Sequence, residues 1–204
     1  MLLVSVPVGV IASRPGRDVG SLEPLLRAKT SSPEESRADG LRLPVRSGLL
    51  ANQAMPSRGP VPARLRIRAI GVDASILPVG VSGGTTEIPA DVDEVGWYRF
   101  GGSFGGSGST LLVAHVSSGT QGSGVFFRLR DLVPGDDVRV ETRDGSATVF
   151  RVIARRSYAK EALPERLFSR TGPALLALVT CGGRFSEATG RYEDNVVVYA
   201  VPRR

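Results

Sequence analysis

The sequence predicts an all-β protein, an eight-stranded closed β-barrel with one or two short helices. Eight short segments between residues 64 and 202 have the alternating or continuously apolar pattern of β-strands. The 25 glycines and 14 prolines in 204 residues provide for many turns and few long helices. Eight strands with this spacing favour a closed barrel over a sandwich, and the chain is long enough for one domain with its own core.

The strand candidates follow one another from residue 64. RLRIRAI (64–70) alternates polar and apolar residues, which is typical of a half-buried strand. STLLVAHV (109–116) and ALLALVTC (174–181) are continuously apolar, which indicates strands covered on both faces. Asp144-Gly145 predicts a hairpin turn between two further strands. The other candidates are SILPVG (75–80), GWYRF (96–100), DDVRVETR (136–143), ATVFRVIARR (147–156) and NVVVYAVP (195–202), and short helices are expected at GVFFRLRDL (124–132) and LPERLF (163–168).

The segments before residue 62 are different in composition. Residues 1–13 are apolar but too short to span a bilayer as a helix, and we interpret them as the remnant of a membrane anchor or signal segment. Residues 14–61 are rich in Arg, Ser, Pro, Glu and Gly and predict a flexible linker. Within it, SLEPLLRAK (21–29) has the pattern of one or two helical turns, with nothing nearby in the sequence to bury them. The main folded domain is therefore expected at 62–204.

Charge and composition exclude several function classes. The net charge of +6 is scattered along the chain, without the basic stripe and stacking aromatics of a nucleic-acid-binding protein, so no nucleic-acid partner is expected. A single cysteine excludes a disulfide scaffold. Asp91, Asp93 and Glu94 form an acidic cluster, but they lack the pattern of a calcium loop and are interpreted as a solvated loop. We expect neither a metal nor a cofactor.

Cys181 and His115 are the only residues of their types, and each stands at the carboxyl end of a continuously apolar strand. If these strands are parallel neighbours, the two side chains lie together at one rim of the barrel. A thiolate can then attack a carbonyl carbon, and the histidine can protonate the leaving amine. Gly182 and Gly183 leave space for a peptide backbone to approach the sulfur. The alternative for the cysteine is a small buried apolar side chain.

Several motifs occur together in one order: VGWY, an apolar strand followed by HV, VFFRLRDLVPGD, an apolar strand followed by VTCGG, and YEDNVVVYA. Over residues 62–202 this set resembles the sortases, in particular the actinobacterial class E/F type. The resemblance implies an eight-stranded barrel and a membrane-anchored cysteine transpeptidase on the extracellular face of the cell membrane. It implies cleavage of an LPxTG-like sorting signal of surface proteins between Thr and Gly, and transfer to an amine acceptor such as a peptidoglycan precursor.

The resemblance also assigns residues. Cys181 matches the family cysteine within Leu178-Val179-Thr180-Cys181, and His115 matches the family histidine. Ala114 stands where class F members commonly have glycine, and the third catalytic position is divided evenly between Asn195 and Arg191.

Thr180, Ala114, Gly182 and Trp97 are candidates for substrate binding, although Trp97 also fits a core strand and Thr180 also fits a simple strand residue. The loop at 155–173 is expected to set specificity. A hydrolase of the same fold and a non-catalytic barrel that serves as a binding or assembly module remain as alternatives.

Overall fold

The computed structural model describes residues 18–27 and 59–203, except residues 83, 161 and 189. Most of the described secondary structure is β. The strands are β1 (Val19–Gly20), β2 (Pro62–Ile67), β3 (Val72–Val79), β4 (Val81–Ser82), β5 (Thr85–Thr86), β6 (Val95–Tyr98), β7 (Ser109–Val113), β8 (Ser117–Ser118), β9 (Gly122–Ser123), β10 (Asp137–Thr142), β11 (Ala147–Ala159), β12 (Leu175–Ser186) and β13 (Arg191–Pro202). The helical elements are α1 (Glu23–Arg27) and the single-turn 3-10 helices η3 (Arg68–Ile70), η4 (Leu129–Asp131) and η5 (Glu165–Phe168).

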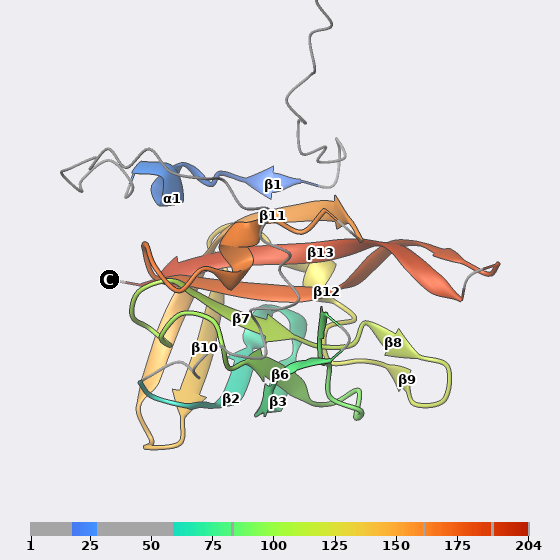
Figure 1. Cartoon of the computed structure of the whole chain (residues 1–204), viewed down its shortest axis with the longest axis horizontal. Helices are drawn as coiled ribbons and strands as arrows, with labels where there is room; N and C mark the ends of the chain where they lie inside the picture. The colour runs from blue at the N-terminus through green and yellow to red at the C-terminus, as the bar shows by residue number, and fades with distance from the viewer. Residues whose placement is uncertain (1–17, 28–58, 83, 161, 189, 204) are drawn as a thin grey trace, which may run out of the picture.

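Eight strands close into a barrel, as the sequence predicts. They are hydrogen-bonded in the order β11-β10-β2-β3-β6-β7-β12-β13, and β13 pairs again with β11 to close the ring (Figure 1). β3 pairs with β6 and β7 pairs with β12 in parallel, and the other neighbours in the ring are antiparallel. All eight predicted strands are present. β12 and β13 continue beyond the predicted bounds as a hairpin that projects from the barrel (Figure 1).

The segment predicted as a helix at 124–132 is a series of turns that ends in η4. Its buried side chains are three residues apart, at Phe126, Leu129 and Leu132. The amide of Leu129 donates to the carbonyl of Phe126, and the amide of Leu132 donates to that of Leu129, at 3.0 and 3.3 Å. This three-residue repeat is that of a 3-10 turn, so the apolar spacing is satisfied without an α-helix. Two small hairpins, β4–β5 and β8–β9, were not predicted.

Part of the segment predicted as a linker packs against the barrel. β1 pairs with β11, and the helical turn predicted after it is present as α1 (Figure 1). Leu22 and Leu25 pack against the buried cluster on the outer face of the barrel, which supplies the apolar partner that the sequence did not reveal. The predicted anchor at 1–13 lies outside the described residues. Among the residues that are described, no helix is long and apolar enough to cross a membrane.

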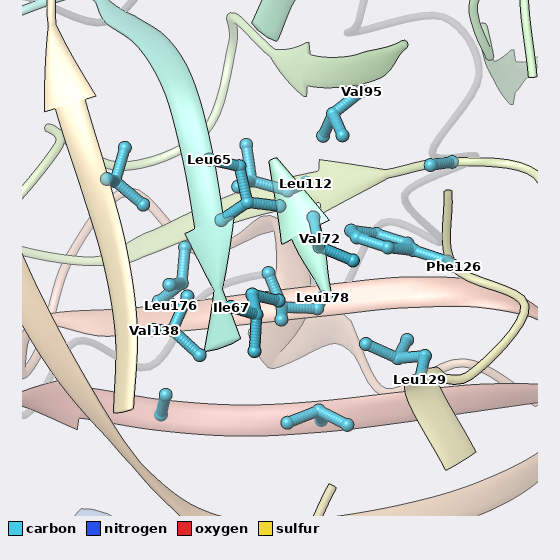
Figure 2. Close-up of a cluster of buried hydrophobic side chains, with 14 of the residues drawn as sticks. Leu65, Ile67, Val72, Val95, Leu112, Phe126, Leu129, Val138, Leu176 and Leu178 are labelled. Carbon is cyan, nitrogen blue, oxygen red and sulfur yellow. The ribbon is translucent and has the colours of Figure 1, made fainter. Parts of the chain in front are cut away.

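Strand alternation divides the buried residues between two faces. Leu112, Leu176 and Leu178 point into the barrel and meet Leu65, Phe126 and other interior side chains, as Figure 2 shows. Their sequence neighbours Leu111, Ala177 and Val179 point outward, into a second buried cluster that includes Leu167 of η5. Because successive strand residues face opposite sides, a strand buried on both faces needs an uninterrupted apolar sequence. This confirms the prediction that the segments around β7 and β12 are covered on both faces.

Candidate active site

The parallel register of β7 and β12 determines where Cys181 and His115 lie. Val113 is paired with Val179, and the ladder continues through a hydrogen bond of 3.2 Å from the amide of Ala114 to the carbonyl of Val179. Cys181 and His115 each follow two residues after this pair. The ladder between the two strands therefore ends just before Cys181, which lies on β12, and His115, which lies in the segment that follows β7. The sequence allowed this arrangement only on the condition that the strands are parallel neighbours, and the structure meets that condition.

A buried side-chain hydrogen bond joins these two segments on the interior side of the barrel. The hydroxyl of Thr180 donates to the carbonyl oxygen of Ala114 at 2.8 Å, and both residues are buried. Each is the residue immediately before one of the two candidate catalytic residues. Thr180 and Ala114, which the sequence suggested for substrate binding, are thus used to hold the two strand ends together.

The imidazole of His115 is oriented by the backbone of another loop. Its Nε2 lies 2.9 Å from the carbonyl oxygen of Pro89. A carbonyl oxygen only accepts, so Nε2–H is the donor, and Nδ1 is the ring nitrogen left for proton exchange. On the other side, a Cβ at Gly124 would meet the backbone carbonyl of His115 and lie 2.9 Å from its Cβ. Glycine is therefore required where the segment that follows β9 packs against the histidine.

Cys181 is half-buried and lies on β12. It pairs with Asn195 on β13, which in turn pairs with Tyr158 on β11. Strand alternation places Cys181 and Asn195 on the outer face, with Val179 and Val197. Asn195 is 8% exposed and is the residue of β13 that stands opposite Cys181.

Lys160 is a site residue that the sequence reasoning missed. Its Nζ donates to Sγ of Cys181 at 3.0 Å and to Oδ1 of Asn195 at 2.9 Å. The Nδ2 of Asn195 donates back to the carbonyl oxygen of Lys160 at 3.3 Å. Lys160 is one of only two lysines in the chain. The sequence did not point to it as a site residue, because it is remote in the chain from Cys181. Only the pairing of β11 with β13 brings it to the site.

The other predicted site residues occupy different places. Gly182 lies against β13, where a Cβ would be 2.6 Å from Cγ2 of Val196, so this glycine permits close packing of the two strands. Trp97 is 4% exposed and belongs to the interior cluster, whereas its neighbour Tyr98 faces the outer side. Arg191 is exposed at the start of β13 and pairs with Ser186. It is four residues from Asn195, about 13 Å along an extended strand.

Two hollows meet at Cys181. The first, which we call the apolar groove, has a volume of about 780 Å³ and runs over the outer face of the barrel. Its lining consists mainly of aliphatic and aromatic side chains: Val81, Ile88, Tyr98, Leu111, Val113, Leu163, Leu167, Phe168 and Val179, with Gly84, Thr85, Thr86, Glu165, Lys160, Thr180, Asn195 and Cys181. Burial raises the pKa of the Tyr98 phenol, so this residue is neutral in the groove. Ile88 directly precedes Pro89, whose carbonyl oxygen is hydrogen-bonded to His115, so this end of the groove lies near the histidine.

The second hollow, which we call the rim pocket, has a volume of about 360 Å³ and is more polar. It is lined by Val116, Phe126, Phe127, Arg130, Asp131, Arg155, Ser157, Thr180, Cys181, Gly182, Gly183, Tyr192 and Val196. Cys181 and Thr180 line both hollows, so the sulfur can be approached from two sides. Among the residues that the structure describes, no group of three His, Cys, Asp or Glu side chains is arranged to hold a metal ion.

Several solved structures that are similar to this chain are sortases. The sortase C2 of pilus island 1 from Group B Streptococcus is similar at a TM-score of 0.54 and 16% identity, over 70% of this chain and 73% of that one. Sortase C-1 from Actinomyces oris is similar at a TM-score of 0.52 and 22% identity, over 70% and 73%. Sortase A from Corynebacterium diphtheriae is similar at a TM-score of 0.51 and 16% identity, over 71% and 61%. At these identities the likeness concerns the fold. No curated protein matches the sequence significantly.

The closed eight-stranded barrel places a thiol where two hollows meet, so the protein is of the class of β-barrels that can carry a cysteine nucleophile. Within that class, the family model of the sortase domain matches residues 65–203, well over half of the chain. The chain therefore belongs to the sortase family, and the family and fold imply a cysteine transpeptidase.

Proposed function

We propose that this protein is a class E/F sortase that cleaves an LPxTG-like sorting signal between Thr and Gly and transfers the new carboxyl end to an amine acceptor. Cys181 is the nucleophile and His115 the general acid and base. The observation that carries the proposal is the parallel register of β7 and β12. It pairs Val113 with Val179, so that Cys181 on β12 and His115 in the segment after β7 each follow two residues beyond the same pair. A nucleophile and a proton donor at one solvent-accessible edge can act on the same peptide bond.

The apolar groove suits the sorting signal. The leucine and proline of such a signal can bury their side chains against Leu111, Val113 and Leu167, which lie in the groove that leads to Cys181. A peptide placed in this way brings the threonine carbonyl to the sulfur. Residues 163–168 of the loop expected to set specificity supply Leu163, Leu167 and Phe168 to the groove, which supports that expectation.

The reaction has two halves. The Cys181 thiolate attacks the threonine carbonyl carbon, and the C–N bond of the tetrahedral intermediate breaks as His115 gives a proton to the leaving glycine amine. An acceptor amine then attacks the thioester and loses a proton to His115, and the thiolate leaves. The rim pocket, which reaches the sulfur from the other side, offers the acceptor an entry that the bound sorting signal does not block. For the third catalytic position, the placement of Asn195 beside the sulfur favours it over Arg191.

The site of action follows from the same proposal. A sortase that modifies surface proteins and joins them to a peptidoglycan precursor works on the extracellular face of the cell membrane. In this proposal, residues 1–13 belong to a membrane anchor or signal segment. The net charge of +6 suits attraction to an anionic envelope.

Mass spectrometry of the protein incubated with LPxTG- and LAxTG-type peptides tests the proposal. We expect a covalent adduct on Cys181 that hydroxylamine releases, together with the free glycine-bearing fragment. The Cys181→Ala variant should form neither. With an added amine such as triglycine, a ligated peptide identifies a transpeptidase, whereas a free acid alone identifies a hydrolase. If no peptide forms an adduct although Cys181 reacts with a methanethiosulfonate, a non-catalytic barrel is the better description.

A further inference from the structure

The candidate site contains a cation that neither the sequence nor the family match assigns. The Lys160 ammonium lies 3.0 Å from Sγ of Cys181, where a developing negative charge on sulfur or on an attacked carbonyl oxygen needs a partner. We propose that Lys160 is the cationic catalytic residue of this enzyme. It stabilises the Cys181 thiolate first and the oxyanion of the tetrahedral intermediate afterwards. This inference rests on the proposed function.

Lys160 is anchored to β13 at three points. Its amide donates to the carbonyl oxygen of Glu193 at 3.3 Å, and its own carbonyl accepts from Nδ2 of Asn195. Its ammonium donates to Oδ1 of the same asparagine at 2.9 Å. Asn195 thus holds both the backbone and the side chain of Lys160. A lysine side chain otherwise has considerable rotamer freedom, so these contacts reduce the entropic cost of keeping its charge at the sulfur.

The arginines near Cys181 are placed less suitably. Arg191 and Arg184 are exposed on the projecting hairpin of β12 and β13. Arg155 lines the rim pocket, but its guanidinium donates to the backbone carbonyls of Arg130 in η4 and of Leu132, which follows η4. Lys160 instead directs its ammonium to the sulfur itself.

The reaction balances with Lys160 protonated throughout. When the Cys181 sulfur forms its bond to the carbonyl carbon, the π electron pair moves to oxygen, and the oxyanion accepts a hydrogen bond from the ammonium. When the C=O bond forms again, the C–N bond breaks, and the proton on the leaving amine comes from His115. Lys160 therefore contributes charge and hydrogen bonds and transfers no proton.

The effect of the Lys160 charge on the reactivity of Cys181 can be measured without any sorting peptide. Cys181 is treated with an anionic and a cationic methanethiosulfonate, MTSES and MTSET, and the ratio of the two rates is measured. Replacing Lys160 with methionine should lower the MTSES to MTSET ratio about fivefold or more, because the cation beside the sulfur is removed. Lys160→Arg should keep the ratio near that of the wild type. Arg151→Met, which removes an exposed charge from β11, the strand that leads to Lys160, is the matched control and should leave the ratio unchanged.

Turnover supplies the second readout. With a peptide and triglycine, Lys160→Met should lose about 10²- to 10³-fold in kcat with a smaller change in KM, as on loss of an oxyanion donor. Lys160→Arg should recover most of this loss. Lys160→Gln replaces Lys160→Met if circular dichroism shows that the methionine variant is unfolded.

Three results would overturn the inference. One is an unchanged methanethiosulfonate ratio in Lys160→Met. Another is an arginine variant as slow as the methionine variant. The third is a wild-type peptide adduct that resists hydroxylamine and maps to Lys160, since that lysine would then be an acceptor. A wild type that reacts with no peptide contradicts the proposed function instead, and the rate ratio still reports on Lys160.

Discussion

The hydroxyl of Thr180 donates a hydrogen bond of 2.8 Å to the carbonyl oxygen of Ala114. These residues immediately precede Cys181 and His115, so one buried bond joins the two chain segments that carry the candidate catalytic pair. A threonine is well suited to this position, since its hydroxyl reaches the neighbouring strand and its branched side chain favours the extended backbone.

Thr180→Val should separate the effect of the hydroxyl group from that of the branched side chain. Valine keeps the shape and strand preference but removes the donor, so the buried carbonyl of Ala114 loses this partner. We expect a loss of about 1–3 kcal/mol in the free energy of unfolding and a lower kcat. Thr180→Ser keeps the hydroxyl and should retain most of the activity. Urea denaturation measures the first effect and peptide ligation the second. Equal activity of the valine and serine variants would show that the bond does not position the pair.

Gly124→Ala should displace His115. The new methyl group would meet the backbone carbonyl and the Cβ of His115, so either the loop or the histidine must move. We expect a destabilisation of about 1–3 kcal/mol and reduced transpeptidation. Gly119→Ala is the control, because a Cβ there has nothing within 4 Å. If both variants behave alike, the close approach at Gly124 is not important for the histidine.

His115→Ala should affect amide and thioester substrates differently. An amine leaving group needs a proton and a thiolate leaving group does not. The variant should therefore lose about 10²- to 10⁴-fold with a peptide amide. With the matching peptide thioester the loss should be much smaller, whereas Cys181→Ala should be inactive with both. An equal loss on both substrates would argue against His115 as the general acid. The rates are measured by chromatography of reaction samples that are quenched at successive times.

Asp144 should contribute to stability only above acidic pH. Hydrogen bonds from Thr142 and Ser146 lower the pKa of its carboxyl from 3.8 to about 2. The folded state thus holds the proton less tightly than the unfolded state does. The contribution is fully present above the unfolded pKa and is lost as pH falls through the folded pKa. Asp144→Asn should lower Tm near pH 6, and the gap from the wild type should close between about pH 4 and pH 2. A gap that does not change with pH would contradict this assignment.

Asp18 should attach the segment that contains β1 and α1 to the barrel. Its carboxylate accepts from the amide of Ser157 at 3.0 Å and lies 3.8 Å from the guanidinium of Arg156, in partly buried surroundings. Asp18→Ala should cost about 1–2 kcal/mol and make residues 18–27 more sensitive to proteases. Asp137→Ala removes a more exposed ion pair with Arg203 and should cost less than about 1 kcal/mol. Limited proteolysis with mass spectrometry compares the two variants.

Much of the barrel is encoded locally. The period-two pattern of β2, the unbroken apolar runs of β7 and β12, and the Asp144-Gly145 turn between β10 and β11 depend on the preferences of adjacent residues. These features can be predicted because strand alternation and turn geometry involve only a few neighbouring residues. The segments at 124–132 and 21–29 were harder to predict, since the barrel and not the local sequence decides whether their apolar residues are buried.

The amino-acid sequence alone determines the eight strands of the barrel, the family and the two residues, Cys181 and His115, that follow apolar runs. It could not show that Asn195 lies opposite the cysteine, that Pro89 orients the histidine, or that Lys160 reaches the sulfur. Those relationships join residues separated by 14 to 35 positions. The contacts of Cys181 with Asn195 and Lys160 arise only when β11, β12 and β13 pair in one register, and the contact of Pro89 with His115 depends on how the segments before β6 and after β7 pack together. Hydrogen bonds between strands have the same backbone chemistry whichever residues they join, so only the packing of the complete barrel selects the register and thus the neighbours of Cys181.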